Sequence, residues 1–208
     1  MVIKICGITQ KKDRDLCFKY GVDLVGYNIY PGSDRFLELS EIKSLITRDN
    51  KDRSVVVGVD LNITGWKAVV ELLNPGFIQL HGREKVGFVK KLKQNFSGTY
   101  IIKKVTRDDM GNMEEILKYA DFILWDSKTK FHGGQGKHFD WTLLNSLDSS
   151  IKKRVFVAGG ITPDNVKEVA SYKTYGLDLA SGVENTPGIK DSKKVKKIMT
   201  KVKNYDKH

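Results

Sequence analysis

Two side chains of opposite acid–base character close two separate apolar runs of this sequence. Cys6 ends the run Val2–Cys6, and Asp126 ends the run Phe122–Asp126 far downstream. Short apolar runs of this length, rich in β-branched residues, are typical of buried β-strands. A thiol and a carboxyl group at the ends of two strands could supply the base and the acid of a proton-transfer reaction. The pair therefore indicates an enzyme.

Small residues follow two later apolar runs, as Gly159-Gly160 and as Ser181-Gly182. Glycine lets the main chain approach an anion closely and adopt a positive φ where a turn needs one. A single Gly-Gly pair is an ordinary turn. Two such clusters after consecutive strands favour a phosphate site, and we expect a phosphorylated substrate.

Short apolar runs alternate with longer amphipathic stretches along the whole chain. The runs predict strands near residues 2–6, 24–28, 54–59, 77–80, 100–104, 122–125, 154–158 and 177–180. Helices are predicted near residues 10–20, 40–48, 64–73, 84–95, 111–119, 140–147, 163–171 and 190–203. Eight strand–helix units without a composition break predict one α/β domain, residues 1–208, folded as a (β/α)8 TIM barrel. An open doubly wound sheet is the alternative, although no Gly-x-Gly-x-x-Gly motif opens the first helix.

The formal net charge is +11, from 36 Lys and Arg against 25 Asp and Glu. Lysine is dense only in residues 190–203, where it alternates with apolar residues at the spacing of a solvated helix face. A basic nucleic-acid-binding protein on the same scaffold is an alternative, but no basic motif with interleaved aromatic residues supports it. We expect no nucleic-acid partner, and a positive field that favours an anionic small substrate.

The sequence shows no secretory segment, and no apolar run approaches the roughly 18 residues of a membrane span. Two cysteines are too few for a disulfide framework, and Cys17 is expected to pack in the core. The spacing of the four histidines matches no metal site. We therefore expect a soluble cytoplasmic protein without a membrane partner or a metal ion. The sequence leaves open whether it is a monomer or a homodimer.

A series of motifs in fixed order resembles the phosphoribosylanthranilate isomerase family of tryptophan biosynthesis. The motifs are KICGIT at 4–9, YPGSDRF at 30–36, IQLHG at 78–82, LWD at 124–126, GGQGKHFDW at 133–141, AGGITPDNV at 158–166 and DLASGVE at 178–184. They span nearly the whole chain. Any one of them would be a weak signal, but their order and spacing together are specific.

The resemblance implies a TIM-barrel aldose–ketose isomerase without cofactor or metal. Its reaction is the Amadori rearrangement of N-(5-phosphoribosyl)anthranilate to 1-(2-carboxyphenylamino)-1-deoxyribulose 5-phosphate. Asp126 stands in the position of the general acid that opens the furanose ring. Cys6 stands in the position of the general base that removes the proton from C2 of the sugar.

These two roles require different surroundings near neutral pH. The acid must be protonated, which a drier environment favours, whereas the thiol must ionise, which a positive potential favours. We therefore expect the site to keep Asp126 in the drier part and to expose Cys6 to cations.

Lys4 lies two residues before Cys6 and should point to the same side of its strand, into the barrel. A buried ammonium group needs a partner. The first and last strands are neighbours in a closed barrel, and Asp178 lies in the last one. We therefore predict an ion pair between Lys4 and Asp178 beneath the site.

The resemblance also assigns substrate contacts. Gly159, Gly160, Ser181 and Gly182 correspond to the phosphate site, His81 to a residue of the pocket wall, and Arg35 to the arginine that holds the anthranilate carboxylate. A guanidinium can bind a carboxylate through two parallel hydrogen bonds. The chain departs from the family at Asp34, where a basic residue is common, and we expect Asp34 to pair with Arg35 in the empty enzyme.

Two further expectations concern the segment after the sixth strand. The glycine-rich loop at 127–137 is interpreted as a lid that closes over the aromatic ring, and Asp140 as the N-cap of the following helix.

The main alternative function is another phosphosugar barrel enzyme, such as an epimerase, a histidine-pathway isomerase or an indole-forming synthase. Such an enzyme would keep the glycine clusters but use other acid–base residues. The combination of Cys6 with Asp126 argues against it.

Overall fold

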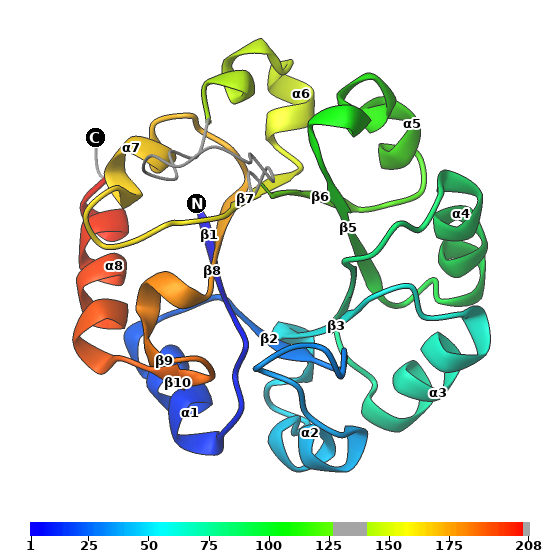
Figure 1. Cartoon of the computed structure of the whole chain (residues 1–208), viewed down its shortest axis with the longest axis horizontal. Coiled ribbons are helices and arrows are strands. Elements are labelled where there is room, and N and C mark those ends of the chain that lie inside the picture. The colour runs from blue at the N-terminus through cyan, green and yellow to red at the C-terminus, as the bar shows by residue number, and fades with distance from the viewer. Residues whose placement is uncertain (127–140, 206–208) are drawn as a thin grey trace.

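The computed structural model describes residues 1–126 and 141–205, and its centre is a closed barrel of eight parallel strands in the order β1 to β8 (Figure 1). The strands are β1 (Val2–Cys6), β2 (Leu24–Asn28), β3 (Ser54–Gly58), β4 (Phe77–Leu80), β5 (Tyr100–Val105), β6 (Phe122–Asp126), β7 (Val155–Ala158) and β8 (Gly176–Leu179). The predicted (β/α)8 barrel is confirmed, and with it the position of all eight predicted strands. The open doubly wound sheet is wrong because β8 pairs with β1.

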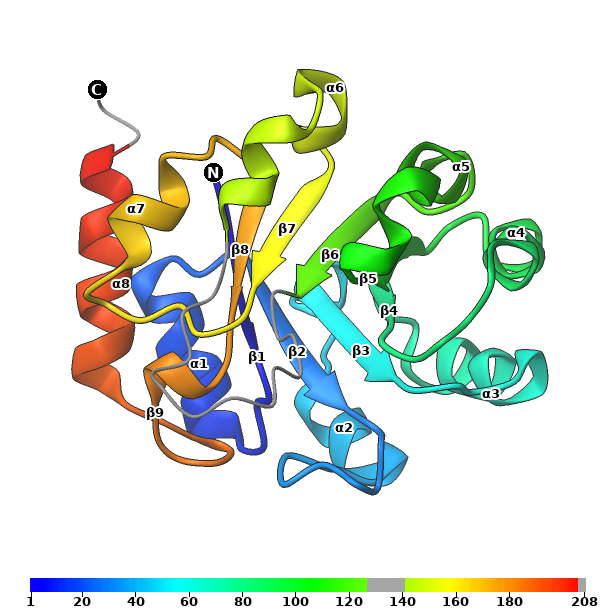
Figure 2. The ribbon, with the colours of Figure 1, turned by 45° about the horizontal axis from the view of Figure 1, so that its top comes forward.

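Helices surround the barrel and cover the outer faces of its strands (Figures 1 and 2). The α-helices are α1 (Lys11–Tyr20), α2 (Leu39–Leu45), α3 (Ile63–Leu73), α4 (Val86–Asn95), α5 (Met113–Leu117), α6 (Ser149–Lys152), α7 (Val166–Ala170) and α8 (Ser192–Tyr205). Short 3-10 turns add η1 (Lys51–Arg53), η2 (Arg107–Asn112), η3 (Thr142–Ser146) and η4 (Ser181–Val183).

The apolar core has two layers because alternate strand residues point to opposite faces. Inside the barrel, Leu24, Val55, Val57, Ile102, Leu124, Phe156 and Ala158 form one cluster. A larger cluster lies between the strands and the helices. Aromatic rings at the strand starts, including Phe77, Tyr100 and Phe122, pack together at the amino-terminal end of the barrel.

The structure differs from the predicted helices in two connections. The helix expected near 111–119 is divided into η2 and the short α5, and the helix expected near 140–147 is replaced by η3 and α6. Gly111 stands inside the first of these segments, where glycine weakens a helix. The predicted lid at 127–137 and the predicted N-cap Asp140 lie outside the described residues.

An antiparallel hairpin of β9 (Glu184–Thr186) and β10 (Ile189–Lys190) follows β8 and was not predicted. Gly188 turns it with a φ of 83°. The last helix then begins at Ser192, after Asp191, whose carboxylate accepts hydrogen bonds from the main-chain N–H groups of Lys193 and Lys194.

The lysine-rich end of the chain is an amphipathic helix, as predicted. In α8 the apolar residues Val195, Ile198 and Val202 are buried, while Lys196 and Lys197 are exposed. In the described part of the chain no helix combines the length and the apolar character needed to cross a membrane.

Candidate active site

A cavity of about 580 Å³ opens at the carboxyl-terminal ends of the strands. Every residue that the sequence assigned to the site lines it: Cys6, Arg35, His81, Asp126, Gly159, Gly160, Ser181 and Gly182. These residues come from six different strand ends or following loops, which is how a TIM barrel assembles a site.

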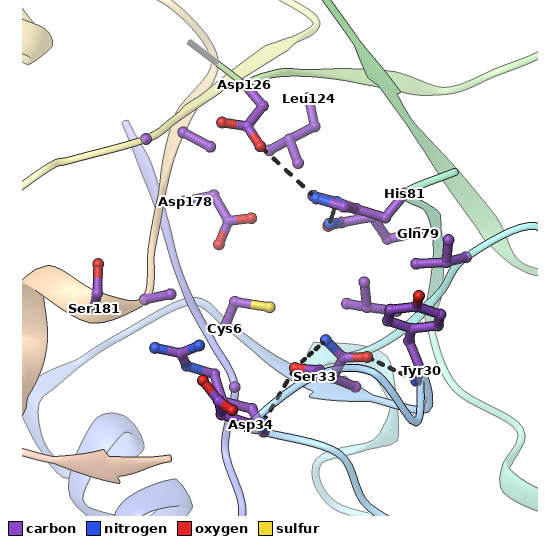
Figure 3. A pocket seen from close by; sticks show the side chains of 18 of the residues that line it. Cys6, Tyr30, Ser33, Asp34, Gln79, His81, Leu124, Asp126, Asp178 and Ser181 are labelled. Carbon is purple, nitrogen blue, oxygen red and sulfur yellow. Dashed lines mark hydrogen bonds and ion pairs between the residues drawn. The ribbon is translucent and has the colours of Figure 1, made fainter. Parts of the chain in front are cut away.

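Cys6 and Asp126 enter the cavity from opposite sides. Figure 3 shows the Cys6 sulfur and the Asp126 carboxylate both projecting into it, with the Asp178 side chain between them in this view. The Asp126 side chain is 11% exposed. Because each residue is the last of its strand, the barrel walls fix both main chains while the side chains reach the open volume.

The predicted ion pair beneath the site is confirmed. Lys4 and Asp178 are register partners of β1 and β8, and Lys4 Nζ lies 2.7 Å from Asp178 Oδ2. Burial lowers the pKa of Lys4, but attraction to Asp178 and to Cys6 outweighs burial and raises it. The buried lysine therefore stays charged and presents its charge to the thiol as well as to the carboxylate.

Gly26 makes room for this arrangement. It is the β2 partner of Cys6, and a Cβ on Gly26 would lie 2.8 Å from Cys6 Sγ and 3.2 Å from Lys4 Nζ. Any larger residue would displace the sulfur or the ammonium group.

His81 lies beside the carboxylate on the β4 side of the cavity (Figure 3). Its Nε2 is 3.8 Å from Asp126 Oδ2, and its Nδ1 is 3.0 Å from the Nε2 atom of the buried Gln79. With the amide group of Gln79 donating to Nδ1, the ring proton sits on Nε2 and faces Asp126. His81 is thus placed to orient the carboxylate.

The glycine clusters form the side of the cavity between β7 and β8. Gly159 and Gly160 have positive φ angles of 93° and 62°, which suit glycine. The Asn165 side chain holds this turn, since it donates to the Gly160 carbonyl and accepts from the Thr162 N–H. A Cβ on Gly182 would stand 1.8 Å from the Ile161 carbonyl oxygen, so the two loops touch at the main chain.

Arg35 pairs with Glu184 and not with Asp34, so the expected Asp34 pair is wrong. Arg35 Nε and Nη2 lie 2.9 Å and 2.5 Å from the two carboxylate oxygens of Glu184. These hydrogen bonds raise the pKa of Arg35. Asp34 lines the cavity and adds only a weaker attraction.

Glu184 receives a second cation, Lys190, at 2.6 Å. Burial alone would raise the pKa of Glu184, but the hydrogen bonds from Arg35 and Lys190 outweigh burial and hold it below its usual range. Sequence reasoning predicted neither the pair of Arg35 with Glu184 nor that of Lys190 with Glu184, although Glu184 is the last residue of the motif DLASGVE at 178–184. The one available signal was Pro187-Gly188, a turn dipeptide that brings residues 184 and 190 together.

The second cysteine behaves as predicted for a packing residue. Cys17 is fully buried in α1, and burial raises its pKa to about 12. Among residues 1–126 and 141–205, no group of three or more His, Cys, Asp or Glu side chains is arranged to hold a metal ion.

Comparison with known proteins decides the family. The sequence model described as N-(5′-phosphoribosyl)anthranilate (PRA) isomerase matches residues 3–201. This chain belongs to that family. The N-(5′-phosphoribosyl)anthranilate isomerase of Staphylococcus haemolyticus is 34% identical over 98% of this chain and 99% of its own length. The enzyme of the same name from a Sulfurihydrogenibium species is 35% identical over 98% of this chain and 100% of its own length.

Solved structures of the same isomerase family share the fold. Monomers generated from the dimeric Thermotoga maritima enzyme match with a TM-score of 0.80 and 28% identity, over 98% of this chain and 100% of theirs. Another structure of this family is a complex with reduced 1-(o-carboxyphenylamino)-1-deoxyribulose 5-phosphate. It matches with a TM-score of 0.79 and 28% identity, over 98% of this chain and 100% of its own.

Proposed function

We propose that this chain catalyses the Amadori rearrangement of N-(5′-phosphoribosyl)anthranilate to 1-(2-carboxyphenylamino)-1-deoxyribulose 5-phosphate, a step of tryptophan biosynthesis. The observation that most strongly supports it is that one cavity brings together a thiol, a carboxyl group and two glycine loops, in a chain of this isomerase family.

Asp126 acts as the general acid. Protonated, it donates its proton to the ring oxygen of the ribose, the ring opens, and the anthranilate nitrogen becomes a protonated Schiff base. His81 holds the carboxyl group in place from the β4 side of the cavity.

Cys6 acts as the general base. As a thiolate it removes the proton from C2 of the open sugar, and the electrons move toward the iminium nitrogen to give an enolamine. The enolamine becomes the ketone when C1 gains a proton and the C2 hydroxyl group loses one. Lys4 and Arg35 both attract the thiolate, because the interaction with Cys6 raises the pKa of each.

The loops after β7 and β8 hold the phosphate group. Gly159, Gly160, Ser181 and Gly182 all line the cavity, and we expect their main-chain N–H groups to donate to the phosphate oxygens. The chain has Ala180 where the family frequently has serine, and contacts from main-chain N–H groups do not need that hydroxyl group.

Arg35 binds the carboxylate of the anthranilate ring. Glu184 occupies Nε and one hydrogen of Nη2, so three of the five guanidinium N–H donors remain for the substrate. The ion pair with Glu184 fixes the guanidinium plane before the substrate arrives, which reduces the entropy cost of binding.

A fluorescence assay of N-(5′-phosphoribosyl)anthranilate consumption tests the function. The wild-type protein should consume the substrate, and Asp126→Asn should lower kcat by about 100-fold or more, the usual contribution of a general acid. Cys17→Ser is the matched control for cysteine chemistry and should retain activity. Absence of turnover by the folded wild-type protein would refute the proposal.

The phosphosugar substrate is the expected partner, and we infer a cytoplasmic monomer or homodimer. Cys6 and Cys17 are both free thiols, which suits a reducing compartment. Light scattering at two protein concentrations distinguishes the monomer from the dimer.

A further inference from the structure

Lys190 is a buried cation that the mechanism above does not use. Its residue is 4% exposed, and its Nζ donates to the main-chain carbonyl of Cys6 at 2.6 Å and to Glu184 Oε1 at 2.6 Å. The main-chain N–H of Lys190 in turn donates to the buried carboxylate of Asp13 in α1. The ammonium group therefore joins the unpredicted hairpin to the strand end that bears the thiol.

These contacts form part of a closed ring of interactions. Glu184 holds Lys190 and Arg35 at once, and the stem of Arg35 lies against Gly7, where a Cβ would stand 2.2 Å from Arg35 Cδ. Gly7 follows Cys6 in the chain and has a φ of 74°. The ring thus runs from Cys6 through Gly7, Arg35, Glu184 and Lys190 back to the Cys6 carbonyl.

We propose that Lys190 is a positioning residue for the base Cys6: it fixes the main chain of Cys6 and adds a positive charge that favours the thiolate. The inference deepens the proposed function and rests on it. Lys190 touches no reacting atom in this account, and it acts through Cys6 and Glu184.

The charges around Cys6 come from several elements. Lys4 lies on β1 itself, Arg35 on the loop after β2, and Glu184 and Lys190 on the hairpin. Asp34 on the loop after β2, Asp126 on β6 and Asp178 on β8 also line the cavity. Lys4 pairs with Asp178, whereas Glu184 pairs with both Arg35 and Lys190. The group of Arg35, Glu184 and Lys190 therefore carries two positive charges against one negative charge.

The test measures the rate of Cys6 alkylation by iodoacetamide against pH, without substrate. Cys17 is fully buried and does not react in the folded protein, so the signal belongs to Cys6. For Lys190→Met we expect alkylation at neutral pH to slow by about threefold to tenfold and its midpoint to rise, because a nearby cation is lost. In parallel, kcat should fall by about tenfold or more, since a displaced base aligns poorly with C2.

Lys194→Met is the matched control. Lys194 Nζ donates to the main-chain carbonyl of Glu184 at 2.7 Å, so this variant loosens the same hairpin without touching Cys6. Its alkylation midpoint should match that of the wild type. Lys190→Arg keeps the charge and should keep the midpoint even where kcat falls.

Glu184→Gln keeps the inference testable should Lys190→Met fail to fold. It removes the negative charge but leaves both cations, so the alkylation midpoint should move down, opposite to Lys190→Met. If Lys190 had a purely structural role, the alkylation midpoints of Lys190→Met and Glu184→Gln would move in the same direction or would both stay unchanged. Unchanged alkylation in Lys190→Met, or an equal shift in Lys194→Met, would overturn the inference while turnover by the wild type still supported the function.

Discussion

At the scale of single residues, the two cysteines show how surroundings separate chemistry from packing. Cys17 is fully buried in α1, with a pKa raised to about 12, whereas Cys6 ends β1 in a cavity and interacts with Lys4 and Arg35. The residue type is the same in both places. Cys6 suits the proposed role of base because it lies at a strand end beside cations, whereas Cys17 is packed in the core.

Gly26→Ala should displace Cys6, the proposed base, without removing its thiol. The new Cβ would lie 2.8 Å from Cys6 Sγ and 3.1 Å from Cys6 Cα, so the thiol must move. We expect kcat to fall by about tenfold or more, because small displacements of a catalytic group are costly. Steady-state kinetics measures this, and Gly98→Ala is the control, since its Cβ would meet nothing within 4 Å. Equal activity of the two variants would contradict the claim that Gly26 must be glycine to leave room for the Cys6 sulfur.

Sequence reasoning succeeded for residues whose position follows from strand periodicity. Alternation along β1 placed Lys4 below Cys6, and barrel closure placed Asp178 beside Lys4, as the 2.7 Å ion pair confirms. It failed for Arg35, whose partner Glu184 is 149 positions away, at the start of the β9–β10 hairpin. No periodic rule connects the loop after β2 with that hairpin, so the nearest acidic residue in the sequence, Asp34, was the wrong choice.

At the scale of elements, the loops after β7 and β8 act as one unit because Gly182 packs on the Ile161 carbonyl. Gly182→Ala should push them apart, since its Cβ would stand 1.8 Å from that oxygen. We expect KM to rise by about tenfold or more with a smaller change in kcat, as the phosphate contacts are lost and the base is untouched.

Gly87→Ala is the control for this change, because Gly87 lies in α4 and its Cβ would be unobstructed. Its KM should equal that of the wild type. An unchanged KM in Gly182→Ala would place the phosphate elsewhere.

The hairpin β9–β10 gives the fold a pH dependence in acid. The pKa of Glu184 is held below its usual 4.5, so its charge stabilises the folded state above pH 4.5, and this contribution is lost as the pH falls through the lowered value. In Glu184→Gln the free energy of unfolding, measured with urea, should depend less on pH between 5 and about 3 than in the wild type. Parallel pH curves for the two proteins would contradict this assignment.

Elements were predicted where the pattern was clear: short apolar runs marked the eight strands, and longer amphipathic stretches marked the helices α1, α3, α4 and α8. The connections around residues 107–117 and 141–152 were not, because short segments with glycine or serine satisfy few helical hydrogen bonds. The hairpin was missed because β9 has only three residues and β10 only two, too few to form an apolar run, although Pro187-Gly188 marked its turn.

At the scale of the whole molecule, the barrel separates a closed aromatic end from a polar end that bears the cavity. Phe122, Phe156 and Tyr175 pack with ring centroids 4.5 to 5.6 Å apart at the first end. The second end holds Asp126, Cys6 and the glycine loops. Such a division explains how one stable scaffold supports a chemically demanding site.

The net charge of +11 should accelerate capture of the anionic substrate. We expect kcat/KM to fall severalfold as the ionic strength rises from about 0.02 to about 0.3 M, while kcat stays nearly constant, because salt screens the long-range attraction. Sucrose at matched viscosity controls for slower diffusion. A kcat/KM that is independent of salt would show that the charge has no part in capture.

The central claim is that Cys6 removes the proton from C2 of the sugar after Asp126 has opened the ring. Its most direct test is the release of deuterium to water from N-(5′-phosphoribosyl)anthranilate labelled at C2. The wild-type protein should release the label at the rate of turnover, and Cys6→Ser should slow release by about 100-fold or more. Release by Cys6→Ser at the wild-type rate would contradict the account.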